Sequence, residues 1–485
     1  MAKSKFRGKR KPSQPNPNNR TLLPELWLEI ITFLSVQDLR HLSKCSRTLR
    51  TFSIPYLFKT FVTHPFDGEQ SNYSLVRQAL GVVGIVRVRK PEDCLQVLSR
   101  PHISGVIETF AILPRGITLR NTQQEATEVS YEIDSLIDQL FELLPKLPKL
   151  KKLVCSRITL SKERVDILLH LPVKQLELQR CILRGFAPAV SKSPGTLESV
   201  TLVFYPNIFD PAWYDSEWVA LFKALFSPSL KSIQSPNIGE VLYTMARCPP
   251  SITNLNIPVE SVTSPHFVSA MGRCPQLHTI SLTCRRGRST YPPMHQLPPH
   301  SFPQLRYYAG PVEYLSGFIQ GRQSIKGVHL VHTPFTAIPA SSIELVPQAV
   351  ESFECSFPGA IGSFLLPTIH SHFSSLKKLT IISRGLGLRE ALEDPAVIPL
   401  PGIRHFKASA FIGLRDDAVK HLEEYVPLLL RVYPGLEVAE LVRPMVDESQ
   451  VTLVWNRNMD SGIDDGRRDE RDVRGSMRVL EMDEV

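Results

Sequence analysis

The sequence lacks the cysteine spacings that hold metal ions or disulfide frameworks. No C-x-x-C occurs among its eight scattered cysteines, which are Cys45, Cys94, Cys155, Cys181, Cys248, Cys274, Cys284 and Cys355. Such a scatter fits buried free thiols better than a zinc site. His370 and His372 lie close together, but no third ligand type is near them, so we expect no metal.

The common catalytic motifs are also missing. The chain contains no G-x-x-x-x-G-K-[ST], no G-x-G-x-x-G, no G-x-S-x-G and no H-E-x-x-H. The acidic pairs 416–417 and 423–424 resemble exposed helix faces, because nothing suggests a pocket around them. No cysteine has a recognisable activating neighbour. We therefore expect a protein that is not an enzyme and needs no cofactor.

Long apolar runs are absent as well. No window approaches 18 uninterrupted apolar residues, and the N-terminus lacks the apolar region of a secretory signal. We expect no membrane association and a location in the cytoplasm, the nucleus or both.

Positive charge is scarce outside one tail. The net charge is +9, but residues 1–20 carry seven basic residues and no acid, which leaves +2 for the other 465 residues. A near-neutral body argues against specific nucleic-acid binding, although the tail alone could bind weakly. We expect a disordered basic tail over 1–20 and a disordered charged tail over 456–485. The basic run 9–11 is either a nuclear-import signal or part of a solvated leader.

The chain does contain a repeat of the form L-x-x-L-x-L, where L is any apolar residue. From Leu150 to Leu436, eleven steps cover 286 residues, an average of 26, which lies within the period of leucine-rich repeats. Clear copies start at Leu150, Val173, Leu197, Ile252, Leu277, Ile325, Val350, Leu376 and Leu436, weaker copies at Leu230, Leu305 and Ile403, and possible earlier ones at Val83 and Ile107.

Each copy predicts a short strand followed by a turn and a helix. Because the apolar positions need stacked neighbours, the repeats predict an α/β fold, an irregular solenoid with a curved parallel sheet and outer helices over 81–445. An ordinary α/β domain whose strands share this pattern is the alternative. The segments 204–218 and 285–303 interrupt the rhythm and either carry specificity or cover the solenoid edge.

Three short amphipathic helices precede the repeats, within residues 22–58. Thr21 and Pro24 favour a helix start, and Ser35 with Asp38 forms a capping box for a second helix. The segment is too short to bury its own apolar surface and requires a partner. That partner is either another protein or the open end of the solenoid.

The stretch LPELWLEIITFLSVQDLRHLSKCSRTLRTFSIPYLF resembles an F-box, including the Leu-Pro-x-Glu opening and the Asp-Leu pair. Lys44 departs from the pattern, because many members carry an apolar residue there. The resemblance implies a domain at 21–60, followed by a linker at 61–80, that docks on the Skp-type adaptor of a cullin–RING ubiquitin ligase. Carried over by position, the apolar contact would come from Leu23, Pro24, Leu26, Ile30, Leu34, Leu39 and Leu42.

Residues between the apolar positions of each repeat are expected on the concave face, because side chains alternate along a strand. A protein target would contact polar residues there, among them Lys152, Lys174, Glu177, Asn256, Arg306, Tyr307, His329, Glu354, Lys378 and Lys407. Together these features predict a substrate-recognition subunit of an SKP–cullin–F-box ubiquitin ligase with an unknown protein substrate. The alternative is a repeat scaffold without a role in ubiquitylation.

Overall fold

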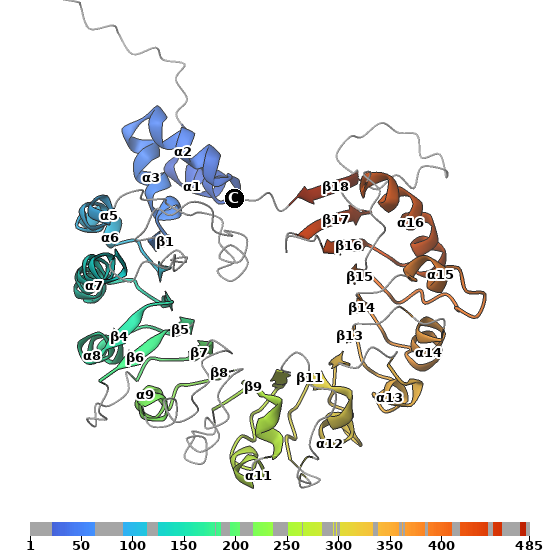
Figure 1. Ribbon diagram of the computed structural model, residues 1–485. Coiled ribbons are helices and arrows are strands. Elements are labelled where there is room, and N and C mark those ends of the chain that lie inside the picture. The colour runs from blue at the N-terminus through green and yellow to red at the C-terminus, as the bar shows by residue number, and fades with distance from the viewer. Residues whose placement is uncertain are drawn as a thin grey trace, which may run out of the picture.

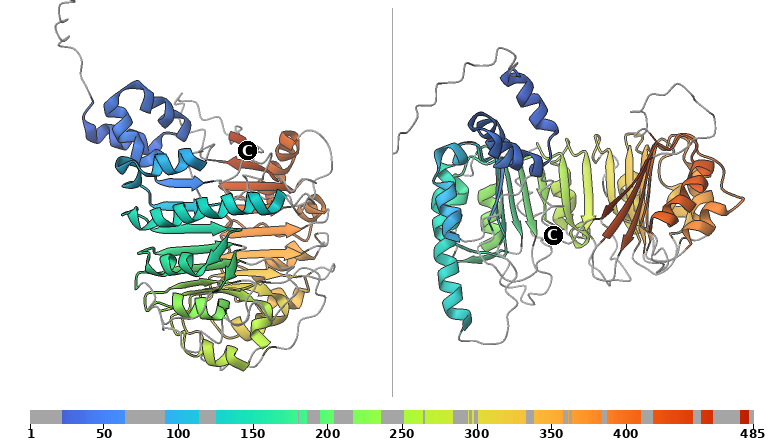
Figure 2. Two further views of the ribbon diagram at one scale, coloured as in Figure 1. Left: turned by 60° about the vertical axis from the view of Figure 1, so that its left-hand side comes forward. Right: turned by 90° about the horizontal axis from the view of Figure 1, so that it is seen from above.

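The computed structural model describes residues 22–63, 91–113, 125–179, 181–185, 195–203, 217–235, 251–263, 265–283, 294, 297, 301–332, 338–357, 361, 364–383, 387–409, 418–444, 450–457 and 476–481. Within them, the chain forms a horseshoe whose inner side is lined by one long sheet and whose outer side carries helices (Figure 1). Seen from above, the strands stand side by side along the curve (Figure 2).

The sheet has 16 strands in an order that follows the chain. Its strands are β1 (Thr60–Thr63), β2 (Thr109–Ile112), β3 (Lys152–Ser156), β5 (Gln175–Gln179), β7 (Ser199–Val203), β8 (Ser232–Gln234), β9 (Asn254–Pro258), β10 (Thr279–Thr283), β11 (Tyr307–Pro311), β12 (Gly327–Val331), β13 (Ser352–Phe357), β14 (Lys378–Ser383), β15 (His405–Ser409), β16 (Val438–Pro444), β17 (Gln450–Asn456) and β18 (Ser476–Glu481). Neighbours from β1 to β16 pair in parallel, whereas β17 and β18 are antiparallel.

The repeat pattern correctly predicted these parallel strands. All twelve copies from Leu150 to Leu436 fall on strands, and the copy at Ile107 falls on β2 in the same way. The register aligns equivalent positions, so that Leu153 of β3 pairs with Leu176 of β5, and Leu176 with Val200 of β7. The possible copy at Val83 lies outside the described residues.

Helices return the chain from one strand to the next on the convex side (Figure 2). They are α5 (Pro91–Leu98), α6 (Pro101–Ser104), α7 (Glu125–Leu143), α8 (Lys162–His170), α9 (Glu217–Leu225), α11 (Pro265–Met271), α12 (Leu315–Ile319), α13 (Ala340–Glu344), α14 (Leu365–His372), α15 (Leu388–Glu393) and α16 (Ala418–Val432). A two-stranded sheet of β4 (Thr159–Ser161) and β6 (Ile182–Arg184) joins two repeats.

One continuous core lies between the sheet and these helices, from Phe61 to Trp455. Alternation along each strand sends its apolar residues inward, as in β5, where Leu176 and Leu178 are at most 2% exposed. Cys155 and Cys181 are buried in this core, and desolvation raises the pKa of both thiols. Cys45, in contrast, is exposed.

The sheet extends beyond the solenoid boundaries that the sequence predicted. The expected linker at 61–80 begins inside β1, which pairs with β2 from Thr60 onward. At the other end, β17 and β18 add to the sheet after residue 445, so the stretch 456–485 contains a strand at Ser476–Glu481. Antiparallel pairing with β17 thus forms a strand in a segment whose charged composition predicted disorder. The tail 1–20 and most of both interrupting segments lie outside the described residues.

The three predicted helices form a small module at the N-terminal end of the horseshoe. They are α1 (Pro24–Phe33), α2 (Val36–Cys45) and α3 (Arg47–Leu57). The Ser35 hydroxyl accepts a hydrogen bond from the Asp38 backbone N–H, as the capping box predicted. Ile31, Leu39 and Leu57 form the module's core. Phe58 packs against this core and against the solenoid core, so the module also contacts the first repeat.

Candidate functional site

Helix α1 presents an apolar stripe to solvent. Leu22, Leu23, Leu26, Ile30 and Phe33 are between 38% and 83% exposed, and Phe33 is the most exposed of them. Leu22 and Leu23 lie directly before the helix, and at 3.6 residues per turn the three helical positions Leu26, Ile30 and Phe33 fall within an arc of about 60°. The opposite side of α1 holds Ile31, the one residue of the helix that is buried. A stripe of this size on a short helix is the surface that a partner's apolar groove would cover.

The structure divides the seven residues expected to contact an adaptor. Leu23, directly before α1, and Pro24, Leu26 and Ile30 on the helix are exposed. Leu34 and Leu42 are half-buried against the module's core, and Leu39 is only 4% exposed within it. Leu39 therefore stabilises the module from inside, which corrects its expected place in the contact surface. The sequence could not separate these positions because both sets are apolar at helical spacing.

The sequence reasoning missed Phe33 and Leu22. Phe33 follows Leu26 by seven residues and Ile30 by three, so extending the i, i+3, i+4, i+7 pattern to the end of α1 would have included it. Leu28 is exposed as well, but at 3.6 residues per turn it points roughly 170° away from the middle of the stripe.

The concave face of the solenoid carries parallel rows of side chains. Lys152, Tyr307 and Lys378 lie at the first position of their strands and share one row. The central row, two residues further along each strand, contains Glu177, Asn256, His329, Glu354 and Lys407. Lys174 and Arg306 instead lie directly before their strands, at the edge of the sheet. The register thus brings most of the expected target-binding residues onto two adjoining rows.

Charged side chains on the concave face pair with each other across neighbouring strands. Lys152 Nζ lies 3.2 Å from Glu177 Oε2. Glu440 on β16 accepts a hydrogen bond from Lys407 Nζ at 2.8 Å and lies 3.0 Å from His405 Nε2. The pKa of Glu440 is lowered to about 2, mainly because His405 donates a hydrogen bond to its carboxylate and also because of Lys407. These charges hold the repeats in register in addition to facing solvent.

Neutral polar side chains form hydrogen bonds with residues of the central row. Thr283 donates its hydroxyl to Asn256 Oδ1 at 2.7 Å. His329 Nε2 lies 2.8 Å from Ser356 Oγ and 3.5 Å from Glu354 Oε1, and burial lowers the pKa of this imidazole. Serine and carboxylate therefore face the same ring nitrogen, whereas a hydrolytic triad uses both nitrogens. This histidine does not form such a triad.

The concave face is apolar at its N-terminal end. In the central row, Val62, Ala111 and Val154 occupy the positions that polar residues hold from Glu177 onward. All three are at most 1% exposed and pack together with Leu113. In the central row, polar side chains therefore begin at the fourth strand of the sheet, β5.

The two neighbouring histidines of α14 make structural contacts. His370 is buried and lies 3.1 Å from the Tyr433 hydroxyl, while Nε2 of His372 lies 2.6 Å from the Val346 carbonyl oxygen. Over the part of the chain that the structure describes, no group of three or more His, Cys, Asp or Glu side chains could hold a metal ion.

Comparisons with known proteins agree with the two-part organisation. The F-box domain family matches residues 21–58, which contain all three helices of the module. No curated protein matches the chain in sequence. In the described part of the chain, no helix combines the length and apolar character needed to cross a membrane.

Solved leucine-rich-repeat structures align with the solenoid at low similarity. The leucine-rich repeat-containing protein LegL7 from Legionella pneumophila aligns over 80% of this chain and 92% of its own, with 11% identity and a TM-score of 0.32. The structure of a TLR13–ssRNA13 complex aligns over 70% and 46%, with 14% identity and a TM-score of 0.36. The Drosophila Toll–Spatzle complex aligns over 74% and 54%, with 12% identity and a TM-score of 0.25. The repeat architecture of this chain rests on its own sheet register.

Proposed function

Starting from a chain that carries an F-box domain ahead of a leucine-rich-repeat solenoid, we propose that this protein is a substrate-recognition subunit of an SKP–cullin–F-box ubiquitin ligase. The module would bind the Skp-type adaptor, and the solenoid would bind a protein target. We place it in the cytoplasm, the nucleus or both.

The exposed stripe on α1 supports this proposal most directly. Leu26, Ile30 and Phe33 expose apolar side chains on one side of α1, Leu23 adds one directly before it, and Ile31 is buried on the other side. Burying such anchors in a groove concentrates binding energy in a few side chains. Of the predicted adaptor contacts, we retain Leu23, Pro24, Leu26 and Ile30, add Phe33, and give Leu34 and Leu42 a supporting role.

In this role the solenoid contributes proximity to the reaction. A target held on the concave face would meet the ubiquitin-transfer machinery at a raised effective concentration. Polar rows with paired charges, such as Lys407 with Glu440, suit a protein partner that is recognised through hydrogen bonds and charge. Neither specific nucleic acid nor a membrane surface is part of the proposal.

A binding experiment with purified Skp-type adaptor tests the docking step. We expect the full-length chain to bind and the double variant Leu26→Asp, Phe33→Asp to lose at least about a hundredfold in affinity, because two charges would enter an apolar groove. Leu28→Asp is the control, since it introduces one aspartate at an exposed leucine on another side of α1. Thermal melting of all three proteins should coincide.

Two outcomes would contradict the docking proposal. Equal adaptor binding by the double variant and the wild type would show that the stripe is not the contact. Absence of binding by the wild type itself would favour a repeat scaffold that does not use the adaptor. Ubiquitylation of a captured target by the assembled ligase would then separate a substrate receptor from a scaffold that merely shares the adaptor.

A further inference from the structure

One edge of the sheet carries a continuous row of mostly charged side chains, which we call the rim row. It consists of the residue directly before each parallel strand of the 16-stranded sheet and the residue directly after β17. Backbone hydrogen bonds join each member to the next. Its members are Lys59, Glu108, Lys151, Lys174, Glu198, Lys231, Thr253, His278, Arg306, Lys326, Glu351, Lys377, Arg404, Glu437 and Arg457. Nine are basic and four are acidic, so the row carries five more positive than negative charges.

The acids of the rim row lie between lysines from adjoining repeats. Glu108 lies 3.8 Å from Lys59 and 2.9 Å from Lys151. The same arrangement recurs at Glu198, between Lys174 and Lys231. It recurs again at Glu351, between Lys326 and Lys377. Each triplet therefore retains one uncompensated positive charge.

The cations of these triplets extend further into solvent than the acids. The six lysine side chains are 55–64% exposed, while Glu108, Glu198 and Glu351 are 28%, 33% and 37% exposed. A partner that approaches the rim row would therefore meet ammonium groups first. Between Glu198 and Glu351 the row contains no acid for five consecutive positions, and in this stretch Arg306 is exposed with no ion pair to any described residue.

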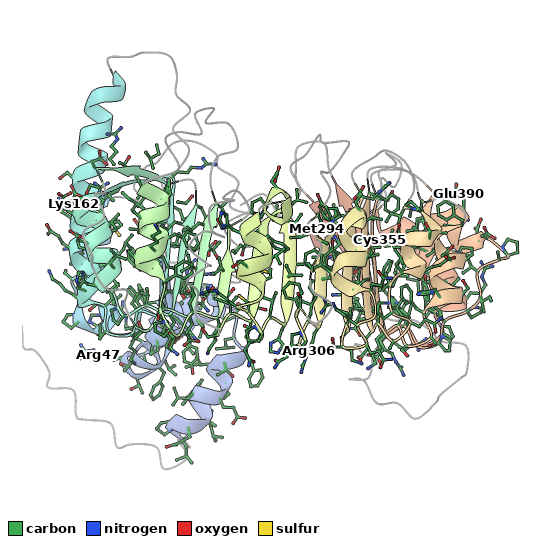
Figure 3. The ribbon with its side chains drawn as sticks, turned by 90° about the horizontal axis from the view of Figure 1, so that it is seen from below. Arg47, Lys162, Met294, Arg306, Cys355 and Glu390 are labelled. Carbon is green, nitrogen blue, oxygen red and sulfur yellow. The ribbon has the colours of Figure 1, made fainter. Side chains whose placement is uncertain are left out.

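The rim row carries more net positive charge than the rest of the body together. Residues 21–485 carry a net charge of +2 and the row alone carries five excess positive charges, so the remainder of the body sums to −3. The row also lies at the edge of the solenoid from which the N-terminal module projects, as the positions of Arg306 and Arg47 show in Figure 3. A segment bound there would run along the side of the solenoid that carries the module.

We propose that the rim row binds an extended segment of the target protein that is rich in aspartate and glutamate. This inference deepens the proposed function, on which it rests, by assigning the class of target. Carboxylates fit the row because single positive charges recur along it and each is exposed. A nucleic-acid backbone fits less well, because its closely spaced phosphates would face the four glutamates of the row as well.

Peptide binding to the full-length chain tests the proposal. The probe is a fluorescein-labelled 12-residue peptide of alternating Glu and Ser, and the readout is anisotropy at low and at physiological salt. We expect binding that weakens with salt, because the contacts are exposed. The variant with Lys231, Arg306, Lys326 and Lys377 each changed to Gln should bind about tenfold more weakly, since four exposed pairs contribute a small factor each.

A second four-site variant is the matched control. It changes Lys146, Lys162, Lys223 and Arg273 to Gln, which removes the same charge from exposed positions elsewhere on the solenoid, and it should bind the peptide like the wild type. If the rim variant does not fold, Arg306→Gln alone, which breaks no ion pair with a described residue, should still weaken binding by about threefold.

Several results would overturn the proposal. One is that the Glu-Ser peptide does not bind. Another is that both four-site variants weaken peptide binding equally. A third is that the chain binds only a peptide that carries phosphoserine in a Gln background. Tighter binding of a 12-nucleotide RNA would overturn it too. Adaptor binding is measured in parallel and should be unchanged in the rim variant. A failure of adaptor binding would therefore refute the proposed function without being confused with a failure of the rim row.

Discussion

Tyr307 on β11 lies against Gly327 on β12, and the two residues are partners in the sheet register. A Cβ atom on Gly327 would lie 2.7 Å from Tyr307 Cδ2, closer than carbon atoms approach without displacement. Burial, with a smaller contribution from the charge of Glu354 on β13, raises the pKa of the Tyr307 phenol to about 12. The missing side chain on β12 thus leaves room for the aromatic ring of Tyr307 on the concave face.

Gly327→Ala should therefore destabilise the solenoid through this one contact. We expect a loss of about 1–3 kcal/mol in the free energy of unfolding, because the new methyl group overpacks against the ring. In a Tyr307→Ala background the same change should cost much less, since the ring is gone. Urea unfolding of the four proteins of this double-mutant cycle measures the difference. Equal costs in both backgrounds would show that the ring does not require the glycine.

A buried arginine joins two outer helices. Arg164 of α8 is 4% exposed, and its Nε donates to Asp138 Oδ1 of α7 at 2.7 Å. The same guanidinium donates to the carboxylate and the carbonyl oxygen of Asp134 and to the carbonyl oxygen of Thr159. All three guanidinium nitrogens are thus bonded, which a buried charge requires.

Arg164→Ala should cost more than Asp138→Ala. The alanine at 164 leaves a void and two carbonyl oxygens without their donor, so we expect about 3 kcal/mol. Asp138 is 55% exposed, and its removal leaves Arg164 paired with Asp134, so about 1 kcal/mol is expected. Thermal or urea unfolding of the two variants gives the ranking. A larger cost at Asp138 would refute this account of the helix pair.

Much of the fold could be predicted because the repeat is periodic. The apolar positions Leu150, Leu153 and Cys155 recur with the same spacing in every copy, and burying them leaves few choices other than stacked strands. The end of the sheet was not predictable in this way. Strands β17 and β18 carry no repeat copy, and their antiparallel pairing depends on contacts with β16 that no local pattern encodes.

The candidate site shows the same limit. Helical spacing correctly identified an amphipathic α1, but it could not tell that Leu39 faces inward while Leu26 faces solvent. Which apolar residues fill a three-helix core depends on how the helices pack, and that information is absent from periodicity alone. The sequence shows which residues of the rim row are charged. It does not show that they lie next to one another, because that depends on the register between strands.

Glu440 gives the concave face a predictable response to acid. Its folded-state pKa of about 2 lies below the value of 4.5 for a free glutamate. Its contribution to stability is therefore complete above about pH 4.5 and is lost as the pH falls towards 2. Against Glu440→Gln, the wild type should be more stable by about 1 kcal/mol near neutral pH, after allowance for solvent screening. Urea unfolding should show this gap closing between about pH 4.5 and 2.

A control at the rim strengthens this experiment. Glu437→Gln removes a carboxylate that is 48% exposed and pairs with Arg404 at 3.2 Å, so it should change stability by less than about 0.5 kcal/mol. A gap for Glu440→Gln that stays constant over the acid range would contradict the assignment of the low pKa to this residue.

Leu39 and Leu26 should respond to substitution in opposite ways. Leu39→Ala removes a side chain that is 4% exposed in the module's core, so we expect a loss of about 2–4 kcal/mol in the module's stability. Leu26→Ala, at a side chain 43% exposed, should leave stability within about 0.5 kcal/mol and weaken adaptor binding instead. Hydrogen exchange of the amides in α2 and α3 measures the first effect, and titration with the adaptor measures the second. If Leu26→Ala also lowers protection in α3, then Leu26 belongs to the core, and the contact surface must be sought among the other exposed residues of α1.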